Sequence, residues 1–338
     1  MSSKTGMIVG GVLVLGFGFF IMMLVLFPSP SDPTSATTGR GALDMVEMSK
    51  PLSFVFTEPT GPGNAGDDYA KALGVYRGNR DTWRSVEERL GRSGIEAVIG
   101  ESEFGLLREL ADYCHDGAQK AKMEYSVPHG QPPTVTTDQA DSLAMTKVMG
   151  YMHVYAQYLF LKSRNHEEAR SAERVAKDLV VMGWHFVRER AYPASVQVGF
   201  GFQEQGSRVL VEIYAKYPEL MQAGDMGIRV REYAQSARMA YADIGRLWSM
   251  WTNNPRPGDF FNVIDNCEDP AWRVQAILGL GITRHRNDGH RGDRIRTEKV
   301  LAKFGASDKE LERRAVKAAL DLSRDEGLRG GPPSAPAP

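Results

Sequence analysis

Cysteine is scarce in this chain, because the 338 residues include only Cys114 and Cys267. Neither belongs to a CxxC or CxxCH motif, so a zinc ribbon, a thioredoxin-type redox site and covalently attached haem lack their sequence basis. The two cysteines could pair in an oxidising compartment, but cysteines this far apart are equally well explained as small buried apolar residues. We expect both to be unpaired.

A strong net charge is also missing. The 41 Lys and Arg residues almost balance the 42 Asp and Glu residues, which leaves a formal charge of -1 at pH 7. The chain therefore has no global field to attract nucleic acid or an anionic membrane, and any electrostatic recognition must be local. With 42% hydrophobic and 25% charged residues, the composition is that of a globular protein with a sizeable core.

Complete catalytic and phosphate-binding motifs are absent from the sequence. The stretch GFGFQEQG, residues 199–206, has Glu204 where a dinucleotide-binding loop needs its third glycine, and it lacks the lysine of a P-loop. The sequence HEEAR at His166 has Arg170 in place of the second histidine of a zinc protease. No G-x-S-x-G motif is present. We therefore predict no catalytic residue, no metal and no cofactor.

Two acidic positions near histidine or serine need separate interpretations. His115 follows Asp112 by three residues, and we interpret this spacing as a solvated pair. Residues 101–104, ESEF, resemble the E-S-x-F motif around the catalytic acid of lytic transglycosylases, which are all-helical enzymes that act on peptidoglycan. The resemblance implies Glu101 as a general acid. That family continues with a nearby G-L-M-Q segment, whereas the LMQ here is at residues 220–222, so the resemblance ends at Glu101.

Residues 7–27, MIVGGVLVLGFGFFIMMLVLF, form a run of 21 residues without a charge. As a helix this run is about 30 Å long, the thickness of the hydrocarbon core of a bilayer. It is longer than the apolar region of about 7–15 residues in a cleaved signal peptide, which remains the alternative. We predict an uncleaved transmembrane anchor.

The expected orientation follows from the positive-inside rule. Lys4 precedes the anchor, and the first basic residue after it is Arg40. The rule then makes residues 1–6 a short cytoplasmic tail and places the C-terminal domain on the extracytoplasmic, periplasmic-type side. The alternative is a cytoplasmic domain on a membrane tether.

The remainder of the chain is expected to be helical after a linker. Residues 28–63 are rich in Pro, Ser, Thr and Gly and predict the linker, and Asn64 then has the character of an N-cap for the first helix of a helical-hairpin domain over residues 64–252. Asn165 and Glu168 have capping-box spacing, so the helices before and after them should form an antiparallel hairpin.

Two helical stripes within this domain have unusual members. On a helix, Gly199 and Gly206 lie on a common side and permit close approach of a neighbouring helix. Gln203 and Ser207 are polar residues within the apolar stripe of this helix, and they indicate either a partner or a buried hydrogen-bond network. A second stripe, over residues 230–251, predicts a core helix of a bundle. The alternative is a partner-binding groove, which its two terminal tryptophans would form if they were exposed: Trp248 and Trp251.

Residues 260–281, FFNVIDNCEDPAWRVQAILGLG, resemble a HEAT-type repeat, with a short helix, an Asp-Pro corner and a second helix. A second copy follows, and the shift from Asp269 to Asp308 is 39 residues, near the period of about 40 of such repeats. The resemblance covers residues 259–325, and it implies an interaction scaffold. We therefore divide the C-terminal part into HEAT-like repeats at 253–326 and a disordered Pro-rich tail at 327–338.

The long polar loop between the two copies is basic. Residues 284–299 contain six Arg or Lys and three acids, which suits an acidic partner, lipid head groups or a phosphate, or alternatively a solvated loop with internal ion pairs. Because no aromatic residue is interleaved with the arginines, nucleic-acid binding is not expected. The predicted partner-binding residues here are Arg284, Arg286, Arg291 and Arg294, in addition to the two tryptophans.

Together these observations predict an all-α protein, with an N-terminal transmembrane helix followed by a right-handed helical-hairpin array, or α-α superhelix, that ends in two HEAT-like repeats. The expected function is that of a scaffold or protein-interaction module at the membrane surface, with a protein partner and no inferred small-molecule ligand. The alternative is a membrane-tethered, peptidoglycan-cleaving enzyme that uses Glu101 as its acid.

Overall fold

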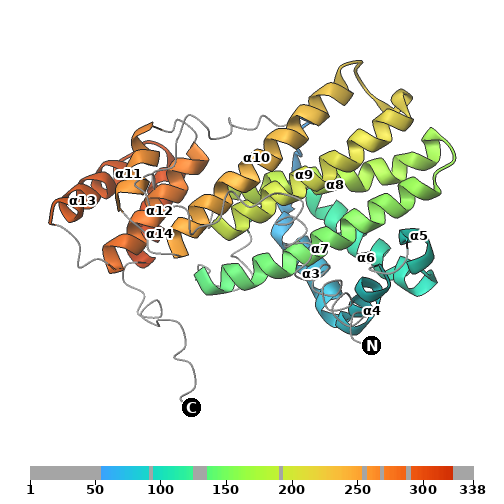
Figure 1. The fold of residues 1–338 in the computed structure, drawn as a ribbon, viewed down its shortest axis with the longest axis horizontal. Coiled ribbons are helices and arrows are strands. Elements are labelled where there is room, and N and C mark those ends of the chain that lie inside the picture. Colours follow the sequence, from blue (N-terminus) through green and yellow to red (C-terminus); the bar gives the residue numbers. More distant parts are fainter. Residues whose placement is uncertain are drawn as a thin grey trace, which may run out of the picture. The chain divides into compact units, whose positions relative to one another are not determined.

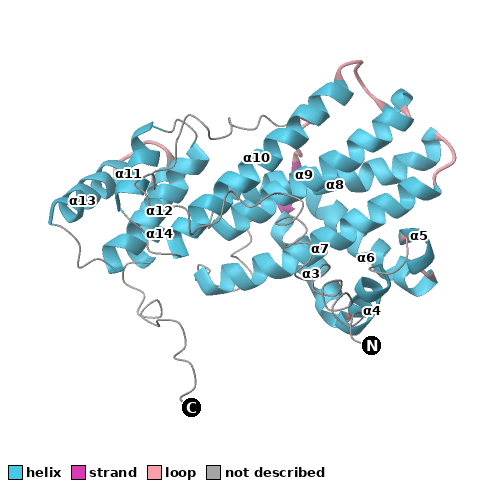
Figure 2. Ribbon diagram, viewed as in Figure 1, coloured by secondary structure: helices cyan, strands magenta, loops and turns pink. Residues whose placement is uncertain are grey.

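The structure is a computed structural model, and it is almost entirely helical (Figures 1 and 2). It describes residues 55–90, 94–124, 135–189, 193–252, 257–266, 270–286 and 291–322. Within these ranges the chain forms twelve α-helices, one 3₁₀ turn and two short strands, which confirms the all-α prediction. The described residues fall into two compact units, the first made of those within 55–189 and 197–238 and the second of those within 193–196 and 239–322.

The first unit contains the long helices. Its elements are β1 (Gly61–Asn64), α3 (Ala65–Gly78), α4 (Arg80–Leu90), α5 (Ile95–Val98), α6 (Glu101–Ala118), β2 (Lys120–Lys122), α7 (Val135–Lys162), α8 (His166–Glu189), most of α9 (Pro193–Lys216), the 3₁₀ turn η4 (Pro218–Leu220) and the first half of α10 (Met226–Thr252). The strands β1 and β2 are parallel neighbours, with Gly61 opposite Lys120 and Asn64 opposite Lys122. The described chain packs on the core from its start, because Val55 and Phe56 already contact core residues.

The helices α7 and α8 form the predicted antiparallel hairpin (Figure 1). Asn165 caps α8, since its side-chain oxygen accepts a hydrogen bond from the Glu168 N–H at 2.9 Å. The Glu168 carboxylate in turn accepts a hydrogen bond from the Arg164 N–H at 2.8 Å. Both hydrogen bonds satisfy N–H groups that the helix cannot pair itself, which is why the chain turns back within a few residues.

The stretch GFGFQEQG is helical, as predicted, and its glycines lie in the contact between α8 and α9. An added Cβ at Gly199 would lie 2.8 Å from the carbonyl oxygen of Gly183 in α8, and one at Gly206 would lie 2.5 Å from the carbonyl oxygen of Ala176. The two backbones therefore approach each other directly. Gln203 and Ser207 are buried in the same region, and the Gln203 Oε1 and Ser207 Oγ atoms have no hydrogen-bond partner.

The second unit consists of short helices in consecutive pairs, and this arrangement is repeat-like. The elements are the end of α10, α11 (Pro257–Asn266), α12 (Pro270–Arg286), α13 (Arg291–Gly305) and α14 (Glu310–Leu322). The central helix is α12, which is buried along most of its length. Two of its glycines allow close contacts, because Gly279 lies against the ring of Phe260 in α11 and Gly281 lies against the backbone of Ala319 in α14.

Several predictions from the sequence lie outside the described residues. These are the anchor at 7–27, most of the linker, Cys267 and the tail at 327–338. Among the residues that the structure does describe, no helix has the length and apolar character needed to cross a membrane. Cys114 is a buried free cysteine.

Two glycine substitutions, one in the contact between α8 and α9 and one on α6, should have opposite effects on the free energy of unfolding. Gly206→Ala should lower the free energy of unfolding by roughly 1–3 kcal/mol, because the new methyl group overlaps the Ala176 carbonyl. Gly105→Ala, on the exposed side of α6 where an added Cβ meets no atom within 4 Å, should raise it by about 0.5–1 kcal/mol. Urea unfolding of the full chain measures both values, and a Gly206→Ala variant as stable as Gly105→Ala would refute the close contact.

Candidate functional site

The predicted partner-binding residues are only partly visible in the structure. Arg284, on α12, and Arg294, on α13, are both exposed. Arg286 ends α12 and Arg291 begins α13, but their side chains lie outside the described residues. The side chains of Trp248 and Trp251, near the end of α10, also lie outside the described residues. The groove that they would form if exposed therefore stays a prediction.

Part of the basic cluster is neutralised inside the second unit. Arg284 forms an ion pair with Glu298 of α13 at 2.9 Å. Arg296 of α13 pairs with Asp265 of α11 at 2.6 Å, and its guanidinium lies 4.2 Å from the centre of the Phe261 ring. These contacts join α13 to α11 and α12. Exposed ion pairs of this kind contribute modest stability. Their main effect here is to pair two of the acids near the basic cluster, Glu298 and Asp265.

A third acid of the second unit is also engaged. Glu312 of α14 is buried, with 3% of its surface exposed. Its carboxylate pairs with Arg273 of α12 at 3.2 Å, lies 3.9 Å from Lys309, and accepts a hydrogen bond from the Ser307 hydroxyl at 2.5 Å. A buried carboxylate needs this many donors, because its desolvation is otherwise uncompensated.

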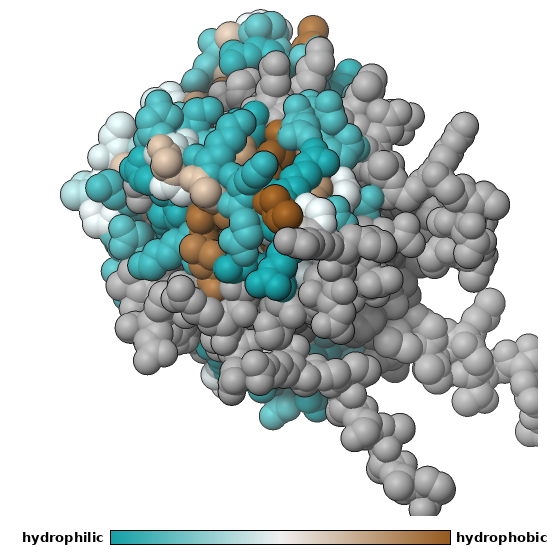
Figure 3. All heavy atoms as spheres, turned by 90° about the vertical axis from the view of Figure 1, so that its left-hand side faces the viewer, coloured by the Kyte–Doolittle hydropathy of each residue, from teal (hydrophilic) through white to brown (hydrophobic). Residues whose placement is uncertain are grey.

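The pairing leaves exposed cations on the last two helices. We call them the cationic set: Arg294, Lys299 and Lys303 on α13, and Arg314 and Lys317 on α14. Across the described residues none of these five side chains forms an ion pair with an acid, and Arg313, beside them on α14, donates to the Ser307 carbonyl at 2.7 Å. The side on which α11 and α13 lie is mostly hydrophilic, with a few apolar side chains between the polar ones (Figure 3). Sequence reasoning missed the α14 members, because they lie outside the 284–299 cluster.

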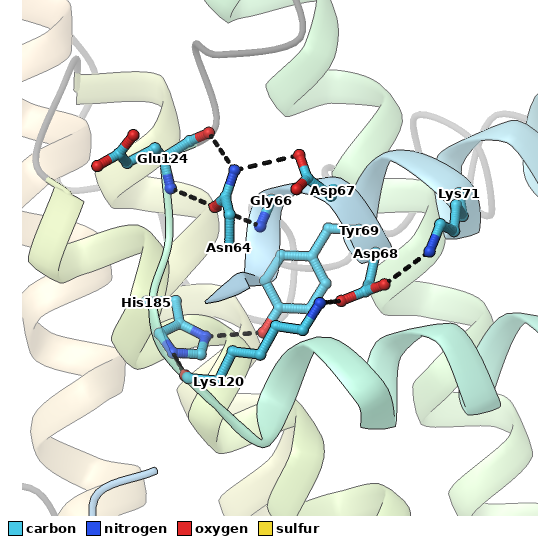
Figure 4. A network of polar contacts seen from close by, with 9 residues as sticks. All are labelled: Asn64, Gly66, Asp67, Asp68, Tyr69, Lys71, Lys120, Glu124 and His185. Atoms are coloured by element: carbon cyan, nitrogen blue, oxygen red, sulfur yellow. Dashed lines mark hydrogen bonds and ion pairs between the residues drawn. The ribbon is translucent and has the colours of Figure 1, made fainter. Parts of the chain in front are cut away.

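In the first unit, Tyr69 lies in a network of polar contacts that includes His185 and Asp68, whose pKa values are shifted (Figure 4). The Tyr69 hydroxyl lies 2.8 Å from Nδ1 of His185, and Nε2 of His185 lies 2.8 Å from the carbonyl oxygen of Lys120. A carbonyl can only accept, so the proton of His185 is on Nε2 and Nδ1 accepts from Tyr69. The imidazole is neutral, and burial lowers the pKa of His185 to about 4.

The Asp68 carboxylate completes this network at the start of α3. It pairs with the ammonium groups of Lys120 and Lys71, the latter at 2.9 Å. Burial acts to raise the pKa of Asp68, but the two ammonium groups outweigh burial and lower it below its ordinary value. The network therefore fixes α3 to the strand β2 and to α8.

Asn64 is the N-cap of α3, as predicted, and it also connects the two strands to the loop after β2. Its side-chain oxygen accepts from the Gly66 N–H at 3.0 Å and from the Glu124 N–H at 2.8 Å. Its side-chain amide donates to the Glu124 carbonyl at 3.2 Å. One side chain thus caps the start of α3 and pairs both the N–H and the carbonyl of Glu124, which lies 60 residues away in sequence.

The interpretation of His115 as a partner of Asp112 is wrong. Nδ1 of His115 lies 3.0 Å from the carboxylate of Asp178 in α8, whereas Asp112 lies 3.8 Å from Arg108 and 3.7 Å from Arg174. Burial raises the pKa of Asp178, and hydrogen bonding to Asp178 raises the pKa of His115. An imidazole that a buried carboxylate orients in this way can serve as a base, but it needs a cleft and a substrate-binding group beside it.

A further buried carboxylate lies in α9. Glu204 is 3% exposed, accepts a hydrogen bond from the Gln205 amide at 2.9 Å and lies 3.5 Å from Arg208. Burial raises its pKa, although the arginines Arg208 and Arg238 act in the opposite direction. This group joins α9 to α10 within the bundle, so its role is structural.

Glu101, the candidate acid of the alternative hypothesis, lies in the first turn of α6 and is exposed. Its neighbour Glu103 is paired with Arg89 at 2.5 Å, which lowers the pKa of Glu103. The general acid of a glycosidase lies in an apolar environment, whereas Glu101 lies on an exposed first helical turn. Across the described parts of the chain, no group of three or more His, Cys, Asp or Glu side chains is placed to hold a metal ion.

The comparisons with known proteins add no relative, because no protein-family model, curated protein or solved structure matches this chain.

The neutral His185 predicts a loss of stability in mild acid. Its folded-state pKa of about 4 lies below the ordinary value of 6.5, so the unfolded chain binds the proton more readily. The contribution of His185 is fully present above pH 6.5 and is lost as the pH falls toward 4, by roughly 3 kcal/mol in all. Urea unfolding should give a lower free energy of unfolding at pH 5 than at pH 7, and His185→Gln should narrow the difference between these two free energies. A difference that His185→Gln leaves unchanged would contradict the role of His185.

The pair of His115 and Asp178 predicts a rescue. His115→Ala should destabilise the protein by roughly 3 kcal/mol at pH 7, because it leaves the buried Asp178 carboxylate without its partner. The loss should grow as the pH rises from the ordinary pKa of an aspartate toward the raised pKa of Asp178, and it should shrink again at the pH where His115 itself deprotonates, because a raised His115 pKa contributes stability only below that pKa. Adding Asp178→Asn should restore part of the stability, and strictly additive effects in this double-mutant cycle would contradict the pairing.

Proposed function

We propose that this protein is a membrane-anchored scaffold that binds a protein partner through its C-terminal helical hairpins. Residues 7–27 supply the anchor, and the helical units lie on the extracytoplasmic side. The charge-free length of residues 7–27 supports the anchor, and the position of Lys4 relative to Arg40 supports the orientation.

The second unit is, in this proposal, a pair of HEAT-like repeats in a right-handed helical array. Support comes from the resemblance of residues 259–325 and from the consecutive short helices, with a central helix α12 between α11 and α14. Repeats of this kind need neighbours to cover their apolar sides, and stacked helix pairs commonly present an extended binding surface.

The observation that carries the proposal is the exposed positive charge of the cationic set. The acids Asp265, Glu298 and Glu312 are engaged within the unit, and the five cations of the set are exposed on α13 and α14. In contrast, three carboxylates of the first unit, Asp68, Asp178 and Glu204, are buried, and each has a basic partner within the unit. The chemistry that reaches the surface therefore favours recognition of an anionic partner.

Capture of a partner by the full chain tests this function. The chain should fractionate with membranes, and after solubilisation in detergent it should retain a specific protein at low salt. Capture should fall as the salt concentration rises, because screening shortens the Debye length from about 30 Å at 0.01 M to about 8 Å at 0.15 M. The variant Arg314→Glu/Lys317→Glu should lose the partner.

The matched control is Arg229→Glu/Arg231→Glu, which reverses two exposed charges on α10 in the first unit. It makes the same change in net charge and should retain the partner. Equal losses in both variants would indicate non-specific attraction, and a wild-type chain that retains no specific protein at any salt concentration would refute the scaffold function.

A further inference from the structure

The outward side of α13 has an unusual composition. Its buried side contains Thr297, Leu301 and Phe304, and the opposite side is exposed. The exposed positions recur every three or four residues, so they form one stripe along the helix. We call this the α13 stripe: Ile295, Lys299, Ala302, Lys303 and Ala306.

Ile295 is the large apolar member of the stripe, and 48% of its surface is exposed. Ala302 and Ala306 follow at spacings that place them on the same side, and their small side chains let another backbone come close. The steps of four and three between positions 295, 299, 302 and 306 match the seam by which one helix packs along another.

Neither lysine of the stripe has an acid three or four residues away, the spacings at which side chains of one helix meet. The positions three and four residues from Lys299 are occupied by Ile295, Arg296, Ala302 and Lys303. Lys303 stands 5.3 Å from the centre of the Phe304 ring, and the nearby acid Glu298 is engaged by Arg284. Like charges four residues apart destabilise a helix, and carboxylates on a partner would remove this repulsion.

We propose that the α13 stripe docks an acidic helical segment of a partner protein, with an apolar residue over Ile295 and carboxylates beside Lys299 and Lys303. This inference rests on the proposed scaffold function and specifies its partner. The apolar contact is small and two alanines follow it along the stripe, which fits a helix, whereas a helix that inserts into a lipid surface needs a broad apolar face of large side chains. An acidic segment also complements the exposed positive charge of Lys299 and Lys303.

Two synthetic amphipathic helices test the docking. Both have the same leucine seam, and this seam is flanked by glutamates in one peptide and by lysines in the other. Fluorescence anisotropy with the full chain in detergent should show binding of the glutamate peptide. Lys299→Glu/Lys303→Glu should weaken this binding by roughly tenfold or more and should gain binding of the lysine peptide. Ile295→Ser should weaken binding of the glutamate peptide without creating affinity for the other.

The control variant Arg229→Glu/Arg231→Glu should bind both peptides as the wild type does, and unchanged thermal unfolding of the α13 variants shows that they fold. Equal weakening by the α10 control, or binding to vesicles of phosphatidylcholine and phosphatidylglycerol but not to the glutamate peptide, overturns the proposal. If a captured natural partner is insensitive to Lys299→Glu/Lys303→Glu, the scaffold function stands and the assignment of this face falls. If the wild-type chain captures no partner at all, the scaffold function itself fails.

Discussion

Gly183 of α8 and Gly199 of α9 meet backbone to backbone, and a side chain at either position would overlap the opposite carbonyl. This contact also sets the orientation of α8. Asp178 and His185 lie two residues after the seam positions Ala176 and Gly183, and two residues correspond to about 200° around a helix. The close contact with α9 therefore turns both polar side chains toward the other side of α8. There they hold α6 through His115, and α3 and β2 through Tyr69 and Lys120.

The features that the sequence predicted correctly depend on neighbours within one or two helical turns. The caps Asn64 and Asn165 were predictable because an N-cap bonds N–H groups two or three residues ahead. The helical placement of GFGFQEQG was predictable because helical periodicity is local and the phosphate-binding alternatives fail on single residues such as Glu204. The close approach of a neighbouring helix to α9 followed from the spacing of Gly199 and Gly206, but the structure was needed to identify that helix as α8.

The features that the sequence did not predict depend on distant partners. His115 was assigned to Asp112 because that acid is on the same helix, but its actual partner is 63 residues away. Tyr69 and His185 are separated by 116 residues, and no periodic pattern connects them. The candidate site shows the same limit. The basic cluster was visible in the sequence, but the pairing of Arg296 with Asp265, 31 residues away, required the fold.

The positive charge of the second unit is already present in its composition, since residues 284–299 alone contain six Arg or Lys and three acids. Folding decides which charges reach the surface. Glu312 is buried, and its carboxylate pairs with Arg273 of α12 and contacts Lys309 and Ser307 of the preceding turn. This pairing holds α14 against α12 and withdraws one charge of each sign from the surface, so the exposed cations of α13 and α14 are the groups on which recognition of an acidic partner would depend.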